Sequence, residues 1–188
     1  DKIDYLNSER KNYNKKGFIE KLYCSENDNN IQVGERLFFT NENGKIIDYL
    51  RSLIKDDDYY SLSSLLYKVS VHNNTSGVFK GFYKDTETNK GQFGGNAKNA
   101  LKRITKTIEL SYPIFFKNQC QTIVKQKDTN ILVKDIENEN IDIAYYDPPY
   151  NEHPYGSNYF MLNCIAKNKE PKTISKVSGI PIDWNKSN

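Results

Sequence analysis

A short apolar stretch that stops at a carboxylate and two prolines places the strongest constraint on how this chain folds. Residues 141–146 are Ile-Asp-Ile-Ala-Tyr-Tyr, and the next four are Asp147, Pro148, Pro149 and Tyr150. β-Branched and aromatic residues favour strands, whereas prolines end them because they lack the backbone N–H that a sheet needs. We therefore predict a buried strand that delivers Asp147 to a rigid loop. Strand ends of this kind are where open α/β sheets place their chemistry.

The preceding segment predicts a neighbour for this strand. Residues 121–126 are strand-like in composition, and Asp128 follows them. Apolar residues at positions 131, 132, 133 and 136 then predict a helix that crosses back to residue 141. Two parallel strands joined by such a helix form a right-handed β-α-β unit. The predicted fold class is therefore α/β, with parallel strands and a crossover helix.

A mainly helical region is predicted upstream of this unit. Apolar residues recur at helical spacing over residues 42–54, and Thr40 fits the N-cap of that helix. A second helix is predicted over residues 59–71, antiparallel to the first, and shorter ones over 97–106 and 157–166. The predicted organisation is an N-terminal arm (1–30), a helical insertion (31–115) and a C-terminal part of the core (116–188).

Composition limits the possible classes of protein. The 188 residues suffice for one domain with a real core, and 14 Tyr and 9 Phe predict that aromatic rings fill much of it. A net charge of +3 permits nucleic-acid binding without arguing for it. Three widely spaced cysteines and two histidines predict no metal site. No apolar run reaches the length of a membrane span, so we expect a soluble, cytoplasmic protein.

The four residues from Asp147 to Tyr150 also resemble motif IV of the amino-methyltransferases, which methylate an exocyclic base nitrogen. An adenine amino group is a poor nucleophile because its lone pair is delocalised into the ring. The resemblance implies that Asp147 and the carbonyl of Pro148 accept its N–H bonds, which frees the lone pair, while Pro149 stiffens the loop. Tyr150 would stack on a base flipped out of the helix. The alternative is a stiff turn that only ends a core strand.

The residues after the motif extend the likeness. Asn151, Tyr155, Asn158 and Tyr159 match its continuation in adenine-N6 DNA methyltransferases of bacterial restriction-modification systems, in particular the FokI-type methylases of the alpha group. The resemblance implies that these four residues contact DNA. It covers most of residues 17–165 and is most specific over 141–159.

Two further segments resemble the same family. Residues 74–84 are similar to its Asn-Thr-containing loop, which implies DNA contacts for Asn74 and Lys84. Asp128 matches the acidic position of motif III, which implies a place near the adenine of the cofactor. An ordinary helix N-cap explains Asp128 equally well.

The resemblance implies a site-specific enzyme with a partial Rossmann-like methyltransferase core. It would transfer a methyl group from S-adenosylmethionine to a flipped adenine in double-stranded DNA, and the helical insertion would read the target sequence. It implies the cytoplasm of a bacterium, or of a cell infected by a phage, as the location. A cognate restriction endonuclease is a further partner that the resemblance admits.

One departure from the family changes the expectation for this chain. Its Phe-x-Gly-x-Gly cofactor loop has no counterpart here, because Phe93-Gly94-Gly95 has another spacing and follows no predicted strand. We therefore expect a fragment that lacks the N-terminal cofactor loop and is inactive alone. Two alternatives stay open. One is a non-catalytic DNA-recognition or interaction module with a vestigial motif. The other is methylation of RNA or of a protein amide, where Asn is more usual than Asp147.

Overall fold

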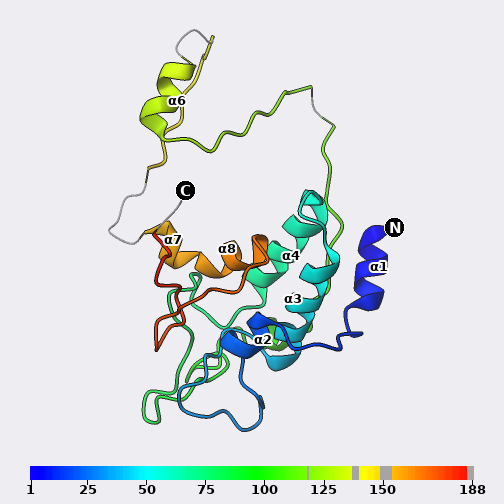
Figure 1. Cartoon of the computed structure of the whole chain (residues 1–188), viewed down its shortest axis with the longest axis vertical. Helices are drawn as coiled ribbons and strands as arrows, with labels where there is room; N and C mark the ends of the chain where they lie inside the picture. The colour runs from blue at the N-terminus through cyan, green and yellow to red at the C-terminus, as the bar shows by residue number, and fades with distance from the viewer. Residues whose placement is uncertain (118, 137–139, 149–153, 186–188) are drawn as a thin grey trace. The chain divides into compact units, whose positions relative to one another are not determined.

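Eight α-helices carry the regular structure of the described residues in this computed structural model (Figure 1). The structure describes residues 1–117, 119–136, 140–148 and 154–185. Contacts divide the chain into two compact units. The larger, here called the packed unit, consists of Asp1–Pro113 and His153–Asn188, and the smaller is Ile114–Glu152.

Two of the predicted helices form the centre of the packed unit. Helix α3 spans Asn41–Leu53 and helix α4 spans Tyr59–Val71, which confirms both predictions. The Thr40 hydroxyl caps α3 by accepting a hydrogen bond from the backbone N–H of Asn43 at 3.1 Å. The two helices contact each other and lie side by side in Figure 1. Their apolar faces therefore supply one wall of the core.

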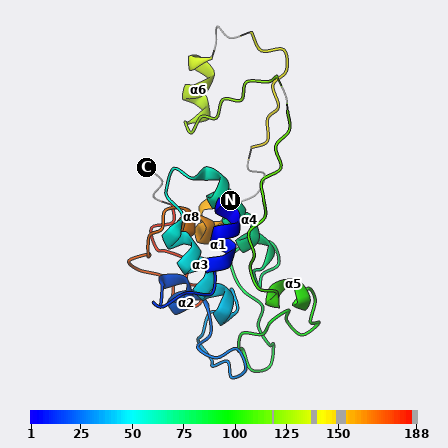
Figure 2. The same cartoon turned by 90° about the vertical axis from the view of Figure 1, so that its right-hand side faces the viewer.

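The remaining helices of the packed unit are short. Helices α1 (Lys2–Glu9) and α2 (Phe18–Tyr23) both contact α3, and Figure 2 shows α1 against it. The predicted basic helix is shorter than expected and forms α5 (Leu101–Thr105). The predicted helix over 157–166 is interrupted at Tyr159. It forms α7 (Tyr155–Asn158) and α8 (Phe160–Ala166), of which α8 contacts α4.

Aromatic rings fill the centre of this unit, as the composition predicts. The ring centroid of Phe38 lies 5.8 Å from that of Tyr23 and 6.1 Å from that of Phe160, both in edge-to-face orientation. Phe79 approaches Phe38 and Phe39 at 6.3 and 6.2 Å. Such offset contacts add to the burial of the rings. Segments far apart in the sequence are thereby joined in one core.

A half-buried carboxylate fixes α2 on α3. The two oxygens of Asp48 accept hydrogen bonds from the backbone N–H groups of Ile19 and Glu20, at 3.0 and 2.9 Å. Burial nevertheless raises the pKa of Asp48 to about 6. A Cβ atom on Gly17 would lie 2.2 Å from the Asp48 Cγ, so this close approach requires a glycine.

A buried arginine holds α8 against α3. The Arg51 guanidinium donates hydrogen bonds of 2.8 Å to the carbonyls of Ile54, Ile165 and Ala166, and it pairs with Asp56 at 2.5 Å. Each buried donor therefore meets an acceptor. These bonds hold the C-terminal end of α8 against the last turn of α3.

The predicted parallel sheet is wrong. The described residues contain three isolated bridges and no ladder of strands, and both strand-like segments of the smaller unit are exposed. Val124 and Tyr145 are each 87% exposed, and Ile143 is 86% exposed. Only the crossover helix is present, as α6 (Thr129–Asp135). A strand is stable only when neighbouring strands satisfy its backbone and a packed layer covers its side chains, and these residues have neither.

None of the helices in the described ranges is long and apolar enough to cross a membrane.

Candidate functional site

The motif that dominates the sequence lies in the smaller unit. Asp147 and Pro148 are exposed and belong to an extended segment without regular structure. Pro149, Tyr150 and Asn151 lie outside the described residues. The predicted strand that would deliver Asp147 is absent, so the roles of these residues remain predictions from the sequence.

Helix α7, which follows the motif, belongs to the packed unit and carries an exposed aromatic pair. The rings of Tyr155 and Tyr159 stack with centroids 5.8 Å apart and planes inclined by 23°. Tyr155 is 50% exposed and Tyr159 is 36% exposed. Paired flat surfaces of this kind can stack on a nucleic-acid base. Of the four residues predicted to follow the motif, Tyr155 and Asn158 lie on α7 and Tyr159 lies at the break directly after it.

The Asn74 side chain is buried, and its amide group makes three hydrogen bonds. Its amide N–H groups donate to the carbonyls of Leu37 and Gln92, at 2.9 and 3.2 Å, and its oxygen accepts from the backbone N–H of Gly94 at 2.9 Å. The predicted direct contact would require these bonds to break. Asn74 instead joins three separate loops, and that positioning role is what the geometry indicates.

Lys84 lies at the base of a small polar loop. Its backbone pairs with Gly91 in an isolated antiparallel bridge, and its ammonium group lies 5.2 Å from the centre of the Phe82 ring. A cation over an aromatic face is held in place but keeps its charge. Lys84 is half-buried and remains a candidate for contact with an anionic partner.

The described residues do not fit a site for S-adenosylmethionine. The Asp128 carboxylate caps α6 by accepting from the backbone N–H of Asn130 at 2.8 Å, which is the N-cap alternative of the sequence. Gly94 and Gly95 both have positive φ, and the Gly94 N–H is taken by Asn74. The turn around them is therefore a structural element of the packed unit. No group of three His, Cys, Asp or Glu side chains in the described part of the chain could hold a metal ion.

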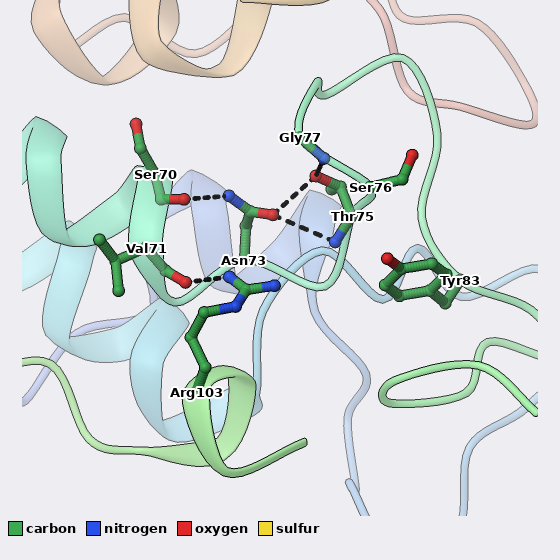
Figure 3. Close-up of a pocket in the computed structure, with 8 residues that line it drawn as sticks. All are labelled: Ser70, Val71, Asn73, Thr75, Ser76, Gly77, Tyr83 and Arg103. Carbon is green, nitrogen blue, oxygen red and sulfur yellow. Dashed lines mark hydrogen bonds between the residues drawn. The ribbon is translucent and has the colours of Figure 1, made fainter. Parts of the chain in front are cut away.

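A pocket that the sequence does not predict opens beside the C-terminal end of α4 (Figure 3). It has a volume of about 500 Å³, and its walls come from α4, the loop that follows it, and α5. The lining residues are Ser70, Val71, Asn73, Thr75, Ser76, Gly77, Tyr83 and Arg103. The signal in the sequence is faint, because these residues are spread over more than thirty positions, and only Thr75, Ser76, Gly77 and Tyr83 fall within the resembling segment 74–84.

His72, whose sequence neighbours Val71 and Asn73 line the pocket, lies near three positive side chains. The His72 ring nitrogen Nδ1 lies 2.6 Å from the Arg103 carbonyl, which ties α5 to the end of α4. Burial lowers the pKa of His72, and the positive charges of Lys68, Lys106 and Arg103 lower it further. The imidazole is therefore neutral at neutral pH and donates its Nδ1 proton to the carbonyl.

Comparison with protein families decides the identity of the chain. Residues 2–178 match the family described as D12 class N6 adenine-specific DNA methyltransferase. The chain belongs to this family. The match spans nearly the whole sequence and includes both units.

Curated relatives point the same way. The type II methyltransferase M.NlaIII of Neisseria lactamica is 33% identical over 162 residues, which are 81% of this chain and 42% of that protein. The modification methylase StsI of Streptococcus sanguinis is 30% identical over 194 residues, or 97% of this chain and 25% of that protein. The type II methyltransferase M.FokI of Planomicrobium okeanokoites is 29% identical over 164 residues, or 81% and 23%.

The chain thus spans less than half the length of these relatives. A search of solved structures found no match.

Proposed function

We propose that this chain is part of a site-specific DNA methyltransferase that methylates the N6 position of adenine in double-stranded DNA. The supporting observation is the D12 family match over residues 2–178, within which Asp147, Pro148, Pro149 and Tyr150 form the expected motif. S-adenosylmethionine is the methyl donor that the family implies. Because the chain covers less than half of its relatives, the reaction is assigned to the whole protein.

In this proposal Asp147 and the Pro148 carbonyl accept the two N–H bonds of the target amine. Drawing both protons toward acceptors reduces delocalisation of the nitrogen lone pair and makes the amine more nucleophilic. Tyr150 stacks on the adenine and returns about 1–3 kcal/mol of the cost of flipping it. After transfer, the amine proton passes to solvent, with the Asp147 carboxylate as the nearest acceptor.

The packed unit is proposed to contact DNA outside the target base, with residues 31–115 reading the recognition sequence. The Lys84 ammonium group lies over the Phe82 ring, and Tyr155 and Tyr159 present stacked rings to solvent. Positive charge attracts the backbone, and exposed rings accept unstacked bases. Asn74 would act indirectly by holding the loops that carry these contacts.

The test is methyl transfer to plasmid DNA by the whole protein, measured as incorporated radioactive methyl groups. Asp147→Asn should lower the rate roughly 100-fold or more, because it removes a charged acceptor at the reacting atom. Asp142→Asn is the matched control, since it removes a carboxylate from the same exposed segment and should leave the rate unchanged. Equal rates for the wild type and Asp147→Asn would contradict the proposal.

A second function is favoured by the way in which the candidate residues are divided between the two units. The pocket and the tyrosine pair belong to the packed unit, whereas Asp147 and Asp128 belong to the smaller one. The chain by itself would then recognise DNA without catalysis. Calorimetry with S-adenosylmethionine on this chain and on the whole protein separates the two functions. Binding by the whole protein supports the enzyme, and binding by neither supports the module.

A further inference from the structure

The pocket beside α4 combines one cation with hydroxyl groups and has no acidic counterpart. None of the described residues that line it carries a carboxylate. Arg103 supplies the positive charge, and Ser70, Thr75, Ser76 and Tyr83 supply hydroxyls. An arginine fork among hydroxyl groups matches the charge and the acceptor oxygens of a phosphate.

Arg103 is oriented before any ligand binds. Its Nη1 donates to the carbonyl of Val71, the last residue of α4, and its own carbonyl meets His72 Nδ1 at 2.6 Å. Within the described residues its Nε and Nη2 make no hydrogen bond, so the N–H groups of both nitrogens remain to bind a ligand. The bond to Val71 also offsets the negative partial charge at the end of α4, which would otherwise repel an anion.

The loop opposite Arg103 is stiffened by its own side chains. Thr75 donates to the Asn73 side-chain oxygen from its backbone N–H at 3.1 Å and from its hydroxyl at 2.6 Å. The backbone N–H of Gly77 in turn donates to the Thr75 hydroxyl at 3.2 Å. In Figure 3 the hydroxyl end of Tyr83 and the Arg103 guanidinium face the same opening. The Tyr83 hydroxyl makes no hydrogen bond within the described residues, so it can serve a ligand.

We propose that this pocket binds a backbone phosphate of DNA, with Arg103 and Tyr83 as its donors. The proposal rests on the proposed function in that it takes DNA as the partner. The volume of about 500 Å³ exceeds that of a phosphate group alone, which leaves room for the adjoining sugar. The exposed Lys106, three residues after Arg103 in the sequence, can meet a neighbouring phosphate. A free phosphate shares the same chemistry and is separated by the experiment.

A structural role is the competing explanation for Arg103. Cations often satisfy the last carbonyls of a helix, and Arg103 does so for α4. That role needs neither the Tyr83 hydroxyl nor the free guanidinium donors. Tyr83→Phe therefore distinguishes the two explanations, because it removes one hydroxyl and leaves the bond from Arg103 to Val71 intact.

The experiment follows the Arg103 Nε–H signal of the full chain by NMR while a short DNA duplex or inorganic phosphate is added. We expect both to shift the signal, with the duplex acting at the lower concentration. A shift with phosphate but not with the duplex would overturn the assignment to DNA. A signal that neither titrant moves would overturn the site altogether.

Duplex affinity, measured by fluorescence anisotropy over a range of salt concentrations, supplies the second readout. Arg103→Gln should weaken binding on the order of tenfold. It should also lower the slope of log affinity against log salt concentration by about the amount expected for one phosphate contact. Tyr83→Phe should weaken it roughly threefold without changing the salt dependence. Lys102→Gln is the control, because it removes a charge from the same helix outside the pocket. In this variant the duplex should shift the Arg103 signal as it does in the wild type. Wild-type affinity of a folded Tyr83→Phe variant would overturn the proposal.

Failure of the proposed reaction can be distinguished from failure of the proposed phosphate site. If the whole protein transfers no methyl group but the duplex still shifts the Arg103 signal, the proposed reaction fails and the phosphate site stands. If methyl transfer depends on Asp147 while Arg103→Gln and Tyr83→Phe bind DNA like the wild type, only the phosphate site fails.

Discussion

The backbone N–H of Phe79 donates a 2.7 Å hydrogen bond to the carbonyl of Asn158. This bond joins the loop that follows α4 to α7, the helix that follows the methyltransferase motif in the sequence. Phe79 is also buried in the aromatic core, so the junction is anchored on its inner side. Residues 74–84 and the residues of α7 each resemble the same family, and this bond makes them neighbours in the packed unit.

The position of α7 depends on a glycine. A Cβ atom on Gly156 would lie 2.8 Å from the Trp184 carbonyl and 3.1 Å from its ring. Gly156→Ala should therefore lower the free energy of unfolding by about 1–3 kcal/mol, measured by urea denaturation. Gly81→Ala is the control, since a Cβ there meets no atom within 4 Å, and should change stability by about 0.5 kcal/mol at most. Equal stabilities of the two variants would contradict the close packing at Trp184.

The three-loop junction depends on one amide. Asn74→Ala leaves the carbonyls of Leu37 and Gln92 and the N–H of Gly94 without their buried partner. We expect a loss of about 3 kcal/mol in the free energy of unfolding. Asn96→Ala removes a comparable but exposed amide and should cost about 0.5 kcal/mol or less. The prediction fails if Asn74→Ala unfolds at the urea concentration of the wild type.

His72 should make folding sensitive to acid. Its pKa in the folded state lies below the ordinary value of 6.5, chiefly because of burial. The unfolded chain then binds more protons at this residue. The contribution of His72 to the free energy of unfolding is therefore fully present above about pH 6.5 and is lost as the pH drops toward the folded pKa. The difference in unfolding free energy between the wild type and His72→Gln should shrink from about pH 8 to about pH 5.

The wild type is compared with His72→Gln because Asp48 also makes the stability of the wild type depend on pH. Its pKa is raised to about 6 in the folded state, so the folded chain takes up a proton first and gains stability as the pH falls from about 6 to about 4. This effect opposes that of His72 and is present in both proteins. A difference that does not change with pH would mean that His72 is not neutral and buried.

Local patterns predicted the helices well. Both α3 and α4 lie within one residue of the predicted bounds, because their caps and apolar spacing are encoded in adjacent residues. The break at Tyr159 was not predicted, since the apolar spacing continues through it. Thr40 was correctly identified as a cap for the same local reason.

The errors concern residues whose environment is set by distant parts of the chain. Ile143 and Tyr145 have the composition of a buried strand, but composition does not supply the neighbouring strands that a sheet needs. The DNA contact of Asn74 stays a prediction, but its hydrogen-bond partners are residues 37, 92 and 94, which its local sequence does not indicate. The pocket beside α4 likewise depends on Arg103 meeting the end of α4, which no local pattern indicates.

The bonds from Arg51 to Ile165 and Ala166 make the packed unit a discontinuous domain, since they join positions 114 and 115 residues apart. The segment Ile114–Glu152 begins and ends between parts of that domain. The entropy lost on closing such a loop grows only with the logarithm of its length, about 0.6 kcal/mol for each doubling. Insertions and deletions in this segment should therefore be tolerated by folding. Selection on its length would then act through the reach of Asp147 rather than through stability.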